Sequence, residues 1–505
     1  MEVLIRQGNV VEMATDALVV NLFQGVTHPG GATGAVDRAL GGAIRDLIRG
    51  GDFDGQLGKT AVLYPRGAIP ARRVILVGLG KSDTFDLEAV RKAAAAAAKR
   101  ARDLGAKEIT TIVHGAGIGG LNPSDAAQAV VEGTVLALYR FAKYQRQQES
   151  SPTTVERLTI VEFDATKIPT LEAGARAGRI IAESVNFARD LVMEPPNIAT
   201  PAELARRAQN MAQEVGLRCE VLTDPELEAL GMGILLGVAQ GSVNRPHFVI
   251  LEHNAEAQEM PTVVLVGKGI TFDTGGINLK RSDDMWKMKH DMAGAAAVLG
   301  ALRAAALLDV PLRVIGLTPL VENMPGGRAY RPADVLRGIT GKTVEVINTD
   351  AEGRLILADA LGYAARFRPH AVVDIATLTG AQMIALGPHA AALFSNDDTL
   401  AARLEQAAQR TGERVWRLPL WEEYKEALKS EVAEVKNTAG RHSGLPTTAK
   451  FLEHFTENYP WAHLDVASMV WTDTARDYHP KGPTGYGVRL FVDFLRRWPG
   501  SEDGR

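Results

Sequence analysis

The sequence predicts an α/β fold with two domains, a smaller N-terminal α/β domain and a larger C-terminal α/β/α domain with a mixed, mainly parallel sheet. The chain has 505 residues, which is more than a single hydrophobic core usually holds. Short apolar runs alternate with longer helical patterns along both halves of the chain. Such alternation is typical of a mainly parallel sheet that is flanked by helices.

The N-terminal domain is expected to cover residues 1–168. Residues 30–34 are expected to form a loop before a helix that runs through Ile48, and an alanine-rich helix is expected at residues 87–104. A further helix is expected to begin at Pro123, because an N-capping asparagine precedes it and proline suits the first helical position. Apolar runs predict strands at residues 17–22, 73–78, 109–113 and 157–163.

Residues 169–194 are expected to form a connecting helix, which Pro195 and Pro196 end. The second domain is then expected to cover residues 195–505. Its predicted strands are residues 248–252, 262–266, 312–317, 344–347 and 371–375, and its clearest helices are residues 293–308 and 355–365. Because helical segments separate most of these strands, a mainly parallel sheet is expected here as well.

Composition and charge limit the class of protein. A net charge of −4 argues against a surface that is entirely a nucleic-acid footprint, although it leaves room for a local basic patch. The single cysteine, Cys219, rules out a disulfide within the chain and favours a reducing compartment. The sequence shows neither a signal peptide nor an apolar stretch long enough to span a bilayer. We therefore expect a cytoplasmic protein without a membrane partner.

A glycine-rich run, Gly115–Gly120, fits the G-x-G-x-x-G pattern of dinucleotide-binding sites and follows a predicted strand. The next helix is delayed to Pro123, and no acidic residue ends a strand about twenty positions further on. We interpret the run as a glycine-rich turn. The His-Glu-x-x-His and Cys-x-x-Cys patterns of many zinc sites are absent from the sequence.

The stretch Asn-Thr-Asp-Ala-Glu-Gly-Arg-Leu, residues 348–355, carries the first part of the candidate chemistry. It places Asp350, Glu352 and Arg354 between an apolar β-branched run and a helical pattern. In α/β folds, ligands sit beyond the carboxyl ends of the strands. A strand that ends in two carboxylates and a guanidinium therefore indicates half of an active site.

A second stretch supplies the other half. A buried strand is expected to end in glycines and to deliver Lys268 and Asp273 into a loop. Lys280 follows, and then Asp291 just before the next helix. Taken alone, Asp291 fits an N-cap better than a site residue. The functional prediction depends on the two stretches converging in space.

Divalent cations explain why so many carboxylates would share one site. Crowded carboxylates repel one another and raise one another's pKa unless cations neutralise them. Oxygen-rich ligands suit Mn²⁺, Mg²⁺ or Zn²⁺, and two such ions can acidify a shared water and clamp a carbonyl group. A lysine ligand has to be neutral, and a nearby dication lowers its pKa.

These residues resemble a known family. Residues 348–355 are similar to the signature octapeptide of the leucyl aminopeptidase (cytosol aminopeptidase) family of two-metal exopeptidases. The order of elements in the first domain matches that family more weakly and implies a macro-like fold there. Further similar segments of the second domain are residues 267–273, 288–291, 322–325, 377–380, 461–465 and 481–485.

The resemblance implies a role for each candidate residue. Lys280 would polarise the scissile carbonyl and stabilise the gem-diolate, and Arg354 would hold a bicarbonate ion as general base. Asp273 and Glu352 would bridge two ions, which would be Mn²⁺ or Zn²⁺, with Mg²⁺ as a further option. The tighter metal site would consist of Lys268, Asp273, Asp291 and Glu352, and the more exchangeable site of Asp273, Asp350 and Glu352.

The resemblance also implies the substrate and the assembly. The free α-amine of a peptide would bind the exchangeable metal, which explains why an exopeptidase requires a free N-terminus. An apolar first pocket favours leucine-like N-terminal residues. The family forms homohexamers, so the same is expected here. Positions that match the pocket lining are Met288, Thr377, Leu378, Gly380 and Ala467.

Two alternatives remain open at this stage. The N-terminal domain could have an architectural or nucleic-acid-binding role beside or instead of catalysis; nucleic acid is not an expected partner. A two-metal site could also hydrolyse phosphate esters. His442 is interpreted as a surface or packing residue rather than a catalytic group.

Overall fold

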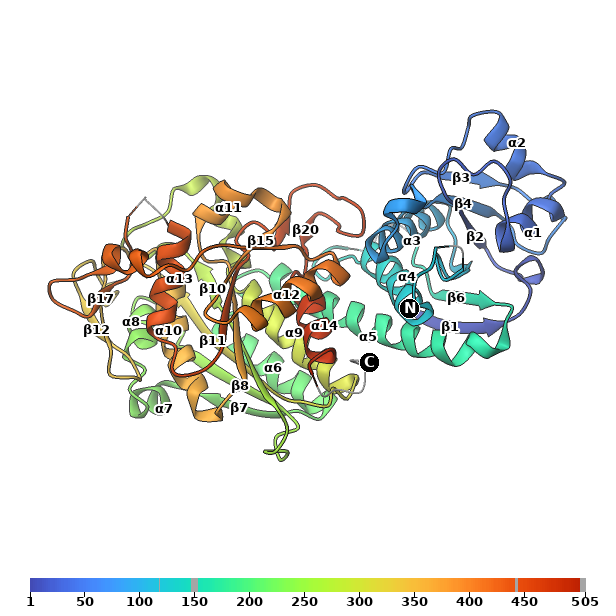
Figure 1. The fold of residues 1–505 in the computed structure, drawn as a ribbon. Coiled ribbons are helices and arrows are strands. Elements are labelled where there is room, and N and C mark those ends of the chain that lie inside the picture. The colour runs from blue at the N-terminus through green and yellow to red at the C-terminus, as the bar shows by residue number, and fades with distance from the viewer. Residues whose placement is uncertain (118, 147–152, 441–443, 500–505) are drawn as a thin grey trace. The chain divides into compact units, whose positions relative to one another are not determined.

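The structure, a computed structural model, describes residues 1–117, 119–146, 153–440 and 444–499 (Figure 1). The chain forms two compact units. The first contains Met1–Asn186 with the later segment Asp473–Lys481, and the second contains Phe187–Thr472 with Gly482–Arg505. A continuous helix, α5 (Ile168–Met193), occupies the stretch that was expected to connect two domains. The domain limits at residues 1–168, 169–194 and 195–505 stay a prediction.

A six-stranded sheet forms the centre of the first unit. Neighbouring strands are parallel except for β3 and β4. Strands β1 and β3 were not predicted, because both lie at sheet edges and are largely half-buried or exposed. The strand order is β1 (Glu2–Gln7), β6 (Arg157–Glu162), β5 (Glu108–Thr111), β2 (Ala17–Leu22), β4 (Val74–Gly78) and β3 (Thr60–Leu63).

Helices cover both faces of this sheet. Alternate residues of β2 point to opposite faces, so Val19 packs in one core and Leu18 in the other. The core around Val19 includes α3 (Leu87–Asp103) and α4 (Pro123–Ala137). The core around Leu18 includes α1 (Gly31–Ala39) and α2 (Ala43–Arg49). The predicted α/β architecture is therefore present in this unit.

The prediction of a loop at residues 30–34 followed by one helix is wrong. The helix begins at Gly31, and a break after Ala39 divides the segment into α1 and α2. Gly41 and Gly42 lie in this break with φ angles of +66° and +93°. A helix cannot continue through this left-handed conformation, which glycine adopts without strain.

His114 provides a test of the buried structure of the first unit. Its ring is fully buried against the side chain of Asn21 (Nδ1–Nδ2 2.8 Å), and burial lowers its pKa to about 4. As the pH falls below about 6.5, the unfolded chain takes up a proton that the folded chain does not. We expect His114 alone to lower the free energy of unfolding by about 2 kcal/mol between pH 7.5 and pH 5. In urea titrations the fall over this range should be smaller by about that amount in His114→Asn than in wild type, and exposed His28→Asn should retain the wild-type dependence.

The second unit is built on a nine-stranded mixed sheet that agrees with the predicted fold class. Its central strands are parallel, whereas β7, β8 and the β15–β18 pair add antiparallel edges. The strand order is β16 (Val415–Arg417), β15 (Ala391–Ser395), β18 (Trp461–Asp465), β14 (Ala371–Ala376), β9 (Thr262–Gly267), β11 (Arg313–Asn323), β8 (His247–His253) and β7 (Arg218–Leu222), and β10 (Gly269–Asp273) pairs with β11.

Helices also pack against this sheet, as Figure 1 shows. One group consists of α6 (Pro201–Val215), α9 (Ala293–Leu307), α12 (Asp398–Thr411) and α14 (Val488–Arg496). A second group consists of α8 (Gly233–Ala239), α10 (Gly353–Ala364) and α13 (Gly444–His454). The short helices α7 (Asp224–Ala229) and α11 (Gly380–Leu386) complete the set of α-helices in the described part of the chain. Cys219 lies half-buried on β7, and burial raises the pKa of its thiol to about 11, which makes it a poor nucleophile.

Two segments near the candidate site differ from the prediction. The strand before residues 348–355 is β13 (Thr343–Glu345), which belongs to a small separate sheet with β12 (Val335–Arg337) and β17 (Val435–Lys436). Its apolar run resembled a central strand because Val344 and Val346 are buried in the core around α10. The second difference is β10, a strand that replaces the expected loop because it continues the pairing with β11. A further two-stranded sheet contains β19 (Trp471–Thr472) and β20 (Gly482–Pro483).

Candidate metal centre

Lys268 lies buried between two consecutive strands, β9 and β10. Its main-chain N–H donates to the carbonyl of Ile375 on β14 (3.0 Å), and its carbonyl accepts from Ala295 on α9 (2.8 Å). The side chain then passes over the first residue of α10. A Cβ on Gly353 would lie 2.4 Å from Lys268 Cε, so only glycine leaves room for this lysine.

The loop before α10 is held from two sides by asparagine side chains. Asn437 accepts from the N–H of Asn348 at 3.2 Å and donates to its carbonyl at 2.7 Å. Asn323 donates to the Thr349 carbonyl at 3.0 Å and to Asp273 Oδ1 at 2.8 Å. Asn323 thereby connects the loop to the end of β10 and fixes the distance between the two stretches.

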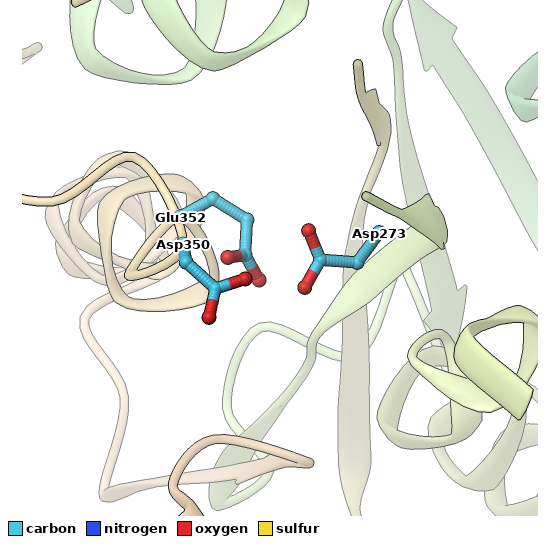
Figure 2. A group of neighbouring side chains, drawn as sticks. All are labelled: Asp273, Asp350 and Glu352. Carbon is cyan, nitrogen blue, oxygen red and sulfur yellow. The ribbon is translucent and has the colours of Figure 1, made fainter. Parts of the chain in front are cut away.

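Three carboxylates from the two stretches lie together. Asp273 at the end of β10 faces Asp350 and Glu352, which precede α10 (Figure 2). One carboxylate oxygen of each residue lies within 4.8 Å of those of the other two. Asp273 and Glu352 are almost fully buried, whereas Asp350 is partly exposed. The structure therefore brings these three residues into a group that can hold a cation.

The Lys268 ammonium group joins a fourth carboxylate to the cluster. Lys268 Nζ lies 2.8 Å from Asp291 Oδ2 and 2.9 Å from Glu352 Oε1. Asp291 also accepts from the Thr377 hydroxyl at 2.7 Å. The N-cap role that fitted Asp291 taken alone is wrong, because Met292 is the N-cap residue of α9 and no side chain caps it. The Asp291 side chain points to the lysine instead.

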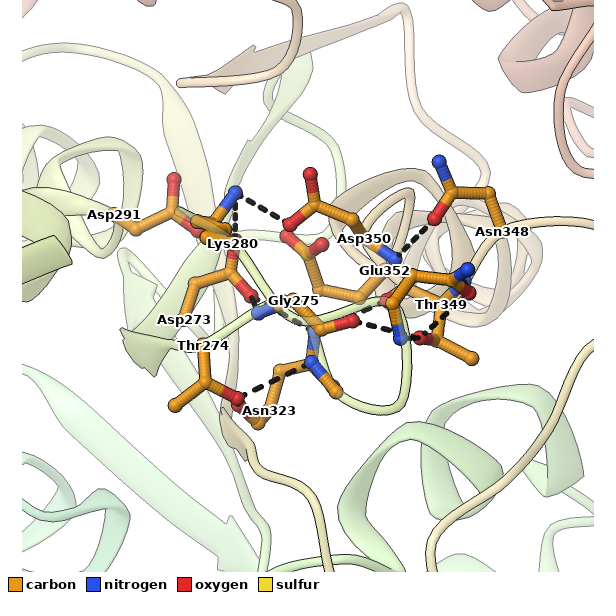
Figure 3. Close-up of polar contacts among 12 residues, drawn as sticks. Asp273, Thr274, Gly275, Lys280, Asp291, Asn323, Asn348, Thr349, Asp350 and Glu352 are labelled. Carbon is orange, nitrogen blue, oxygen red and sulfur yellow. Dashed lines mark hydrogen bonds and ion pairs between the residues drawn. The ribbon is translucent and has the colours of Figure 1, made fainter. Parts of the chain in front are cut away.

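Lys280 lies between the two stretches (Figure 3). Its Nζ lies 2.8 Å from Asp273 Oδ2 and 2.5 Å from Asp350 Oδ1. About a quarter of the side chain is exposed. An ammonium group in this position is therefore accessible to a molecule that enters the site.

Burial and mutual repulsion shape the protonation of the cluster. Burial, with the neighbouring Glu352 and Asp273 carboxylates, raises the pKa of Asp291 to about 8 against the opposing effect of Lys268. Burial likewise raises the pKa of Asp273 and of Asp350. Burial alone would lower the pKa of Lys268, but its ion pairs outweigh that effect and raise it. The cluster holds four carboxyl groups against two ammonium groups, so ionising all four carboxyl groups without a further cation would cost free energy.

A divalent cation fits this environment. Glu352 Oε2 is buried and has no hydrogen-bond partner among the described residues. Its other oxygen contacts Lys268, so the unpaired oxygen is available to a further positive group. Carboxylate oxygens in excess of the available ammonium groups are the donor set that Mn²⁺, Mg²⁺ and Zn²⁺ accept. The group Asp273, Asp350 and Glu352 therefore satisfies the chemistry of a metal site.

Arg354 is buried near this cluster and is incompletely paired. Its NH1 donates to the Asn437 carbonyl at 2.9 Å. Its Nε is buried and makes no hydrogen bond within the described part of the chain. Burial lowers the pKa of the guanidinium to about 10, so it remains charged at neutral pH. A buried guanidinium with an unused donor fits a small anion.

The predicted pocket residues lie on neighbouring elements. Thr377, Leu378 and Gly380 follow β14, and Ala467 follows β18, which pairs with β14 in parallel. Thr377 also accepts a hydrogen bond from Lys268 Nζ through its carbonyl (2.7 Å). Met288 lies in the 3₁₀ helix η4 (Ser282–His290), and this helix ends at the residue before Asp291. The carboxyl ends of two adjacent strands thus carry four of these five residues.

Several residues that support the site were not found from the sequence. Asn323, Asn437 and Tyr330 hold the loop before α10, with Tyr330 donating to the Thr349 carbonyl at 2.7 Å. Asp465 accepts hydrogen bonds from main-chain N–H groups after β14 and β18. Each is a single polar residue in an otherwise ordinary segment. Asn323 and Asp465 lie at the ends of apolar strands and within the segments 322–325 and 461–465 that resemble the family, but no role had been assigned to either residue.

Two expectations concern other parts of the chain. None of the helices in the described residues is both long and apolar enough to cross a bilayer. His442 lies outside the described residues, so its expected role as a surface or packing residue stays a prediction. Ile118 of the glycine-rich run Gly115–Gly120 also lies outside them.

Comparisons of sequence identify relatives over nearly the whole chain. The catalytic domain of the cytosol aminopeptidase family matches residues 186–492, and the N-terminal domain of that family matches residues 19–148. A probable cytosol aminopeptidase of Roseiflexus castenholzii is 46% identical over 99% of each chain. One of Geobacter sulfurreducens is 44% identical over 91% of this chain and 92% of its own.

Solved structures lead to the same family. A mutant of tomato leucine aminopeptidase superposes with a TM-score of 0.87 at 33% identity, over 99% of this chain and 97% of that chain. The bottromycin maturation enzyme BotP in complex with Mn has a TM-score of 0.84 at 36% identity, over 96% of this chain and 99% of that chain. The chain therefore belongs to the cytosol aminopeptidase family and is a metal-dependent aminopeptidase, a hydrolase.

Proposed function

We propose that the chain releases N-terminal residues, preferably leucine-like ones, from peptides with the help of two divalent ions. The observation that carries the proposal is the convergence of Asp273, Asp350 and Glu352, with Lys268 and Asp291 beside them. Two such ions would be Mn²⁺ or Zn²⁺, with Mg²⁺ as a further option, and would supply an acidified water and a Lewis acid for the peptide carbonyl.

The side chains divide between two ion sites in this proposal. Lys268 Nζ contacts Asp291 and Glu352, whereas Lys280 Nζ contacts Asp273 and Asp350. The tighter site consists of Lys268, Asp273, Asp291 and Glu352, and the exchangeable site of Asp273, Asp350 and Glu352. Lys268 has to lose a proton to act as a ligand, so metal binding there should release protons.

Lys280 is the proposed electrophile. Its ammonium group lies at the partly exposed edge of the cluster, next to Asp273 and Asp350. Its ion pairs outweigh the effect of burial and raise its pKa, so the group is charged at neutral pH. An ammonium held in this place stabilises the negative charge that develops on a substrate carbonyl oxygen.

Arg354 is the proposed holder of a bicarbonate ion that acts as general base. Its charge and the unused Nε donor favour a small planar anion, and its position after Glu352 would bring such an anion near the cluster. The side chain would hold such an anion in place, and the anion would supply a general base.

The first test is hydrolysis of Leu-p-nitroanilide by the full chain. We expect turnover with Mn²⁺ or Zn²⁺ and its loss with a chelator, because the carboxylates alone cannot activate water. Acetylation of the substrate amine should abolish cleavage, since the proposal requires a free amine at the exchangeable metal. Unchanged cleavage of the acetylated substrate would contradict amine recognition. Turnover of an aryl phosphate in place of the anilide would favour the phosphate-ester alternative.

Asp465 is expected to position the side-chain pocket. Its buried carboxylate accepts from the N–H groups of Leu378 (3.2 Å), Thr379 (3.4 Å) and Ala467 (3.3 Å). We expect Asp465→Asn to raise KM for Leu-p-nitroanilide about tenfold with a smaller change in kcat, because a neutral amide oxygen accepts hydrogen bonds from the pocket segments more weakly than the carboxylate does. Asp397→Asn is the matched control, since Asp397 caps α12 through Leu400 N–H (2.7 Å). Equal KM values for both variants would contradict a positioning role.

Assembly, location and specificity form the rest of the proposal. We infer a homohexamer, which sedimentation of the metal-loaded chain would test. We also infer a cytoplasmic location, which the names of the relatives support. The pocket residues Met288, Thr377, Leu378, Gly380 and Ala467 would receive the first side chain. Comparison of leucine, alanine and glutamate anilides would test the preference for leucine.

A further inference from the structure

The second unit holds a cavity of about 580 Å³ at the amino end of β11. Such a volume falls within the range of small-molecule sites. Arg313, the first residue of β11, lines the cavity, whereas Asn323 at the metal centre is the last residue of the same strand. The 11 residues of β11 span about 33 Å, so the cavity is remote from the metal centre.

The floor of the cavity contains a buried arginine with unused donors. Arg313 NH2 donates to Glu252 Oε2 at 2.8 Å, and its NH1 donates to Gln258 Oε1 at 3.1 Å. The Arg313 side chain is only 8% exposed, and its Nε is buried without a hydrogen-bond partner among the described residues. A guanidinium group has five N–H donors. Buried donors that lack an acceptor favour an anion that enters the cavity.

Two further guanidinium groups lie at the exposed rim of the cavity. Arg366 packs over the ring of Tyr363, with its Cζ 4.3 Å from the ring centroid. Arg368 lies two residues further along the chain. Within the part of the chain that the structure describes, neither arginine forms an ion pair with a carboxylate. Both charges are therefore available to a ligand carboxylate.

One carboxylate of the cavity is available to a cation. Glu252 pairs with Arg313, and Glu226 accepts from the main-chain N–H of Thr223 at 2.9 Å. Glu220 of β7, in contrast, makes no hydrogen bond or ion pair with another described residue. Burial raises the pKa of Tyr363, Arg366 opposes this effect and Glu220 adds to it, so both charges lie around one hydroxyl group.

The remaining wall of the cavity is apolar. Leu222 and Ile250 belong to the buried core, and Leu230 packs against that core. Such a wall favours an aliphatic group. The three glutamates that line the cavity would repel a ligand with several negative charges. The cavity therefore matches a ligand with one carboxylate, one ammonium group and an aliphatic side chain.

We propose that this cavity binds a free aliphatic α-amino acid such as leucine. The ligand carboxylate lies at the arginines, the ammonium group at Glu220 and the side chain on the apolar wall. Leucine released at the metal centre would supply this ligand, and that link rests on the proposed function. The binding itself does not, because none of the lining residues belongs to the metal centre.

Equilibrium dialysis of the full chain against radiolabelled L-leucine tests the proposal, once with metal and once with a chelator. We expect saturable binding of one leucine per chain that persists with the chelator, because the cavity lies outside the metal centre. Two analogues serve as competitors: 4-methylpentanoate lacks the ammonium group of leucine, and 3-methylbutylamine lacks its carboxylate. Each should compete at least about tenfold more weakly than leucine, because only leucine uses both charged sides of the cavity.

Two variants assign the charges. Glu220→Gln should weaken leucine about tenfold and leave 4-methylpentanoate unchanged, since only the ammonium group contacts this carboxylate. Arg366→Gln should weaken both ligands about tenfold, because both carry the carboxylate. Glu228→Gln and Arg328→Gln are the matched controls and should change nothing, because both residues are exposed and lie outside the cavity lining.

Three results would overturn the proposal. The first is the absence of saturable leucine binding in the presence of the chelator, which would restrict leucine to the metal centre. The second is competition by 4-methylpentanoate as tight as that by leucine, which would indicate a general anion site. The third is unchanged leucine affinity in both Glu220→Gln and Arg366→Gln. Loss of anilide turnover with intact leucine binding would refute the proposed function alone and would support this site.

Discussion

Replacing Glu352 with glutamine is expected to remove aminopeptidase turnover and to lower the metal content of the protein. Glu352 is buried, contacts Lys268 through Oε1 at 2.9 Å and leaves Oε2 unpaired. It is also the residue that belongs to both proposed ion sites. Loss of a residue that only supports a ligand typically costs about 10- to 100-fold in affinity or activity, so loss of a bridging ligand should cost more. Turnover of Leu-p-nitroanilide and metal analysis after gel filtration measure both effects.

The stability of the metal-free variant separates a ligand role from a structural one. Without metal, the cluster carries more negative than positive charge, so Glu352→Gln relieves repulsion and should not lower the melting temperature. A residue that mainly stabilises the fold would lower it. Glu345→Gln is the matched control, because Glu345 lies on β13, outside the cluster, and accepts from Ser430 instead. Full metal content in Glu352→Gln, or equal loss in Glu345→Gln, would contradict the assignment.

Most of the fold class could be predicted from periodicity, because buried parallel strands give continuous apolar runs. Strands β9 and β14 are fully buried, and their predicted limits differ from the structure by one residue at most. Edge strands such as β1 lack this signal, since half of their surface faces water. The separate sheet of β13 could not be foreseen, because pairing partners far apart in sequence decide sheet membership.

The candidate site was only partly visible in the sequence for a related reason. The lysines and carboxylates of the cluster stood out because they come from two short stretches. The groups that orient them come one at a time from distant segments, as Asn437 and Asn323 do on the two sides of one loop. The sequence next to Asp291 suggested a helix cap for the same reason. A carboxylate just before a helix fits an N-cap, and only the structure shows that Asp291 contacts the buried Lys268 instead. Spatial proximity, rather than residue type, decides the role.

Replacing Lys280 with methionine is expected to remove turnover while the protein still binds two metal ions. Methionine keeps most of the side-chain volume but removes the charge that lies 2.8 Å from Asp273 and 2.5 Å from Asp350. Both carboxylates become easier to neutralise with a dication, so metal affinity should not fall. The carbonyl oxygen loses its positive partner, and loss of one such group typically costs about 10²- to 10³-fold in kcat. Metal analysis and steady-state kinetics on the same sample separate the two effects.

Lys287→Met is the control on the neighbouring helix η4. Lys287 pairs with Asp284 at 3.2 Å and lies outside the carboxylate cluster, so its loss should leave kcat and metal content unchanged. A fall in metal content of Lys280→Met in proportion to its activity would make Lys280 a structural residue, and retention of turnover would remove it from the mechanism. If turnover falls only in part, kcat and KM are compared. An electrophile acts on the transition state, so the loss of Lys280 should change kcat more than KM. The two stretches together then account for both binding of the ions and activation of the carbonyl.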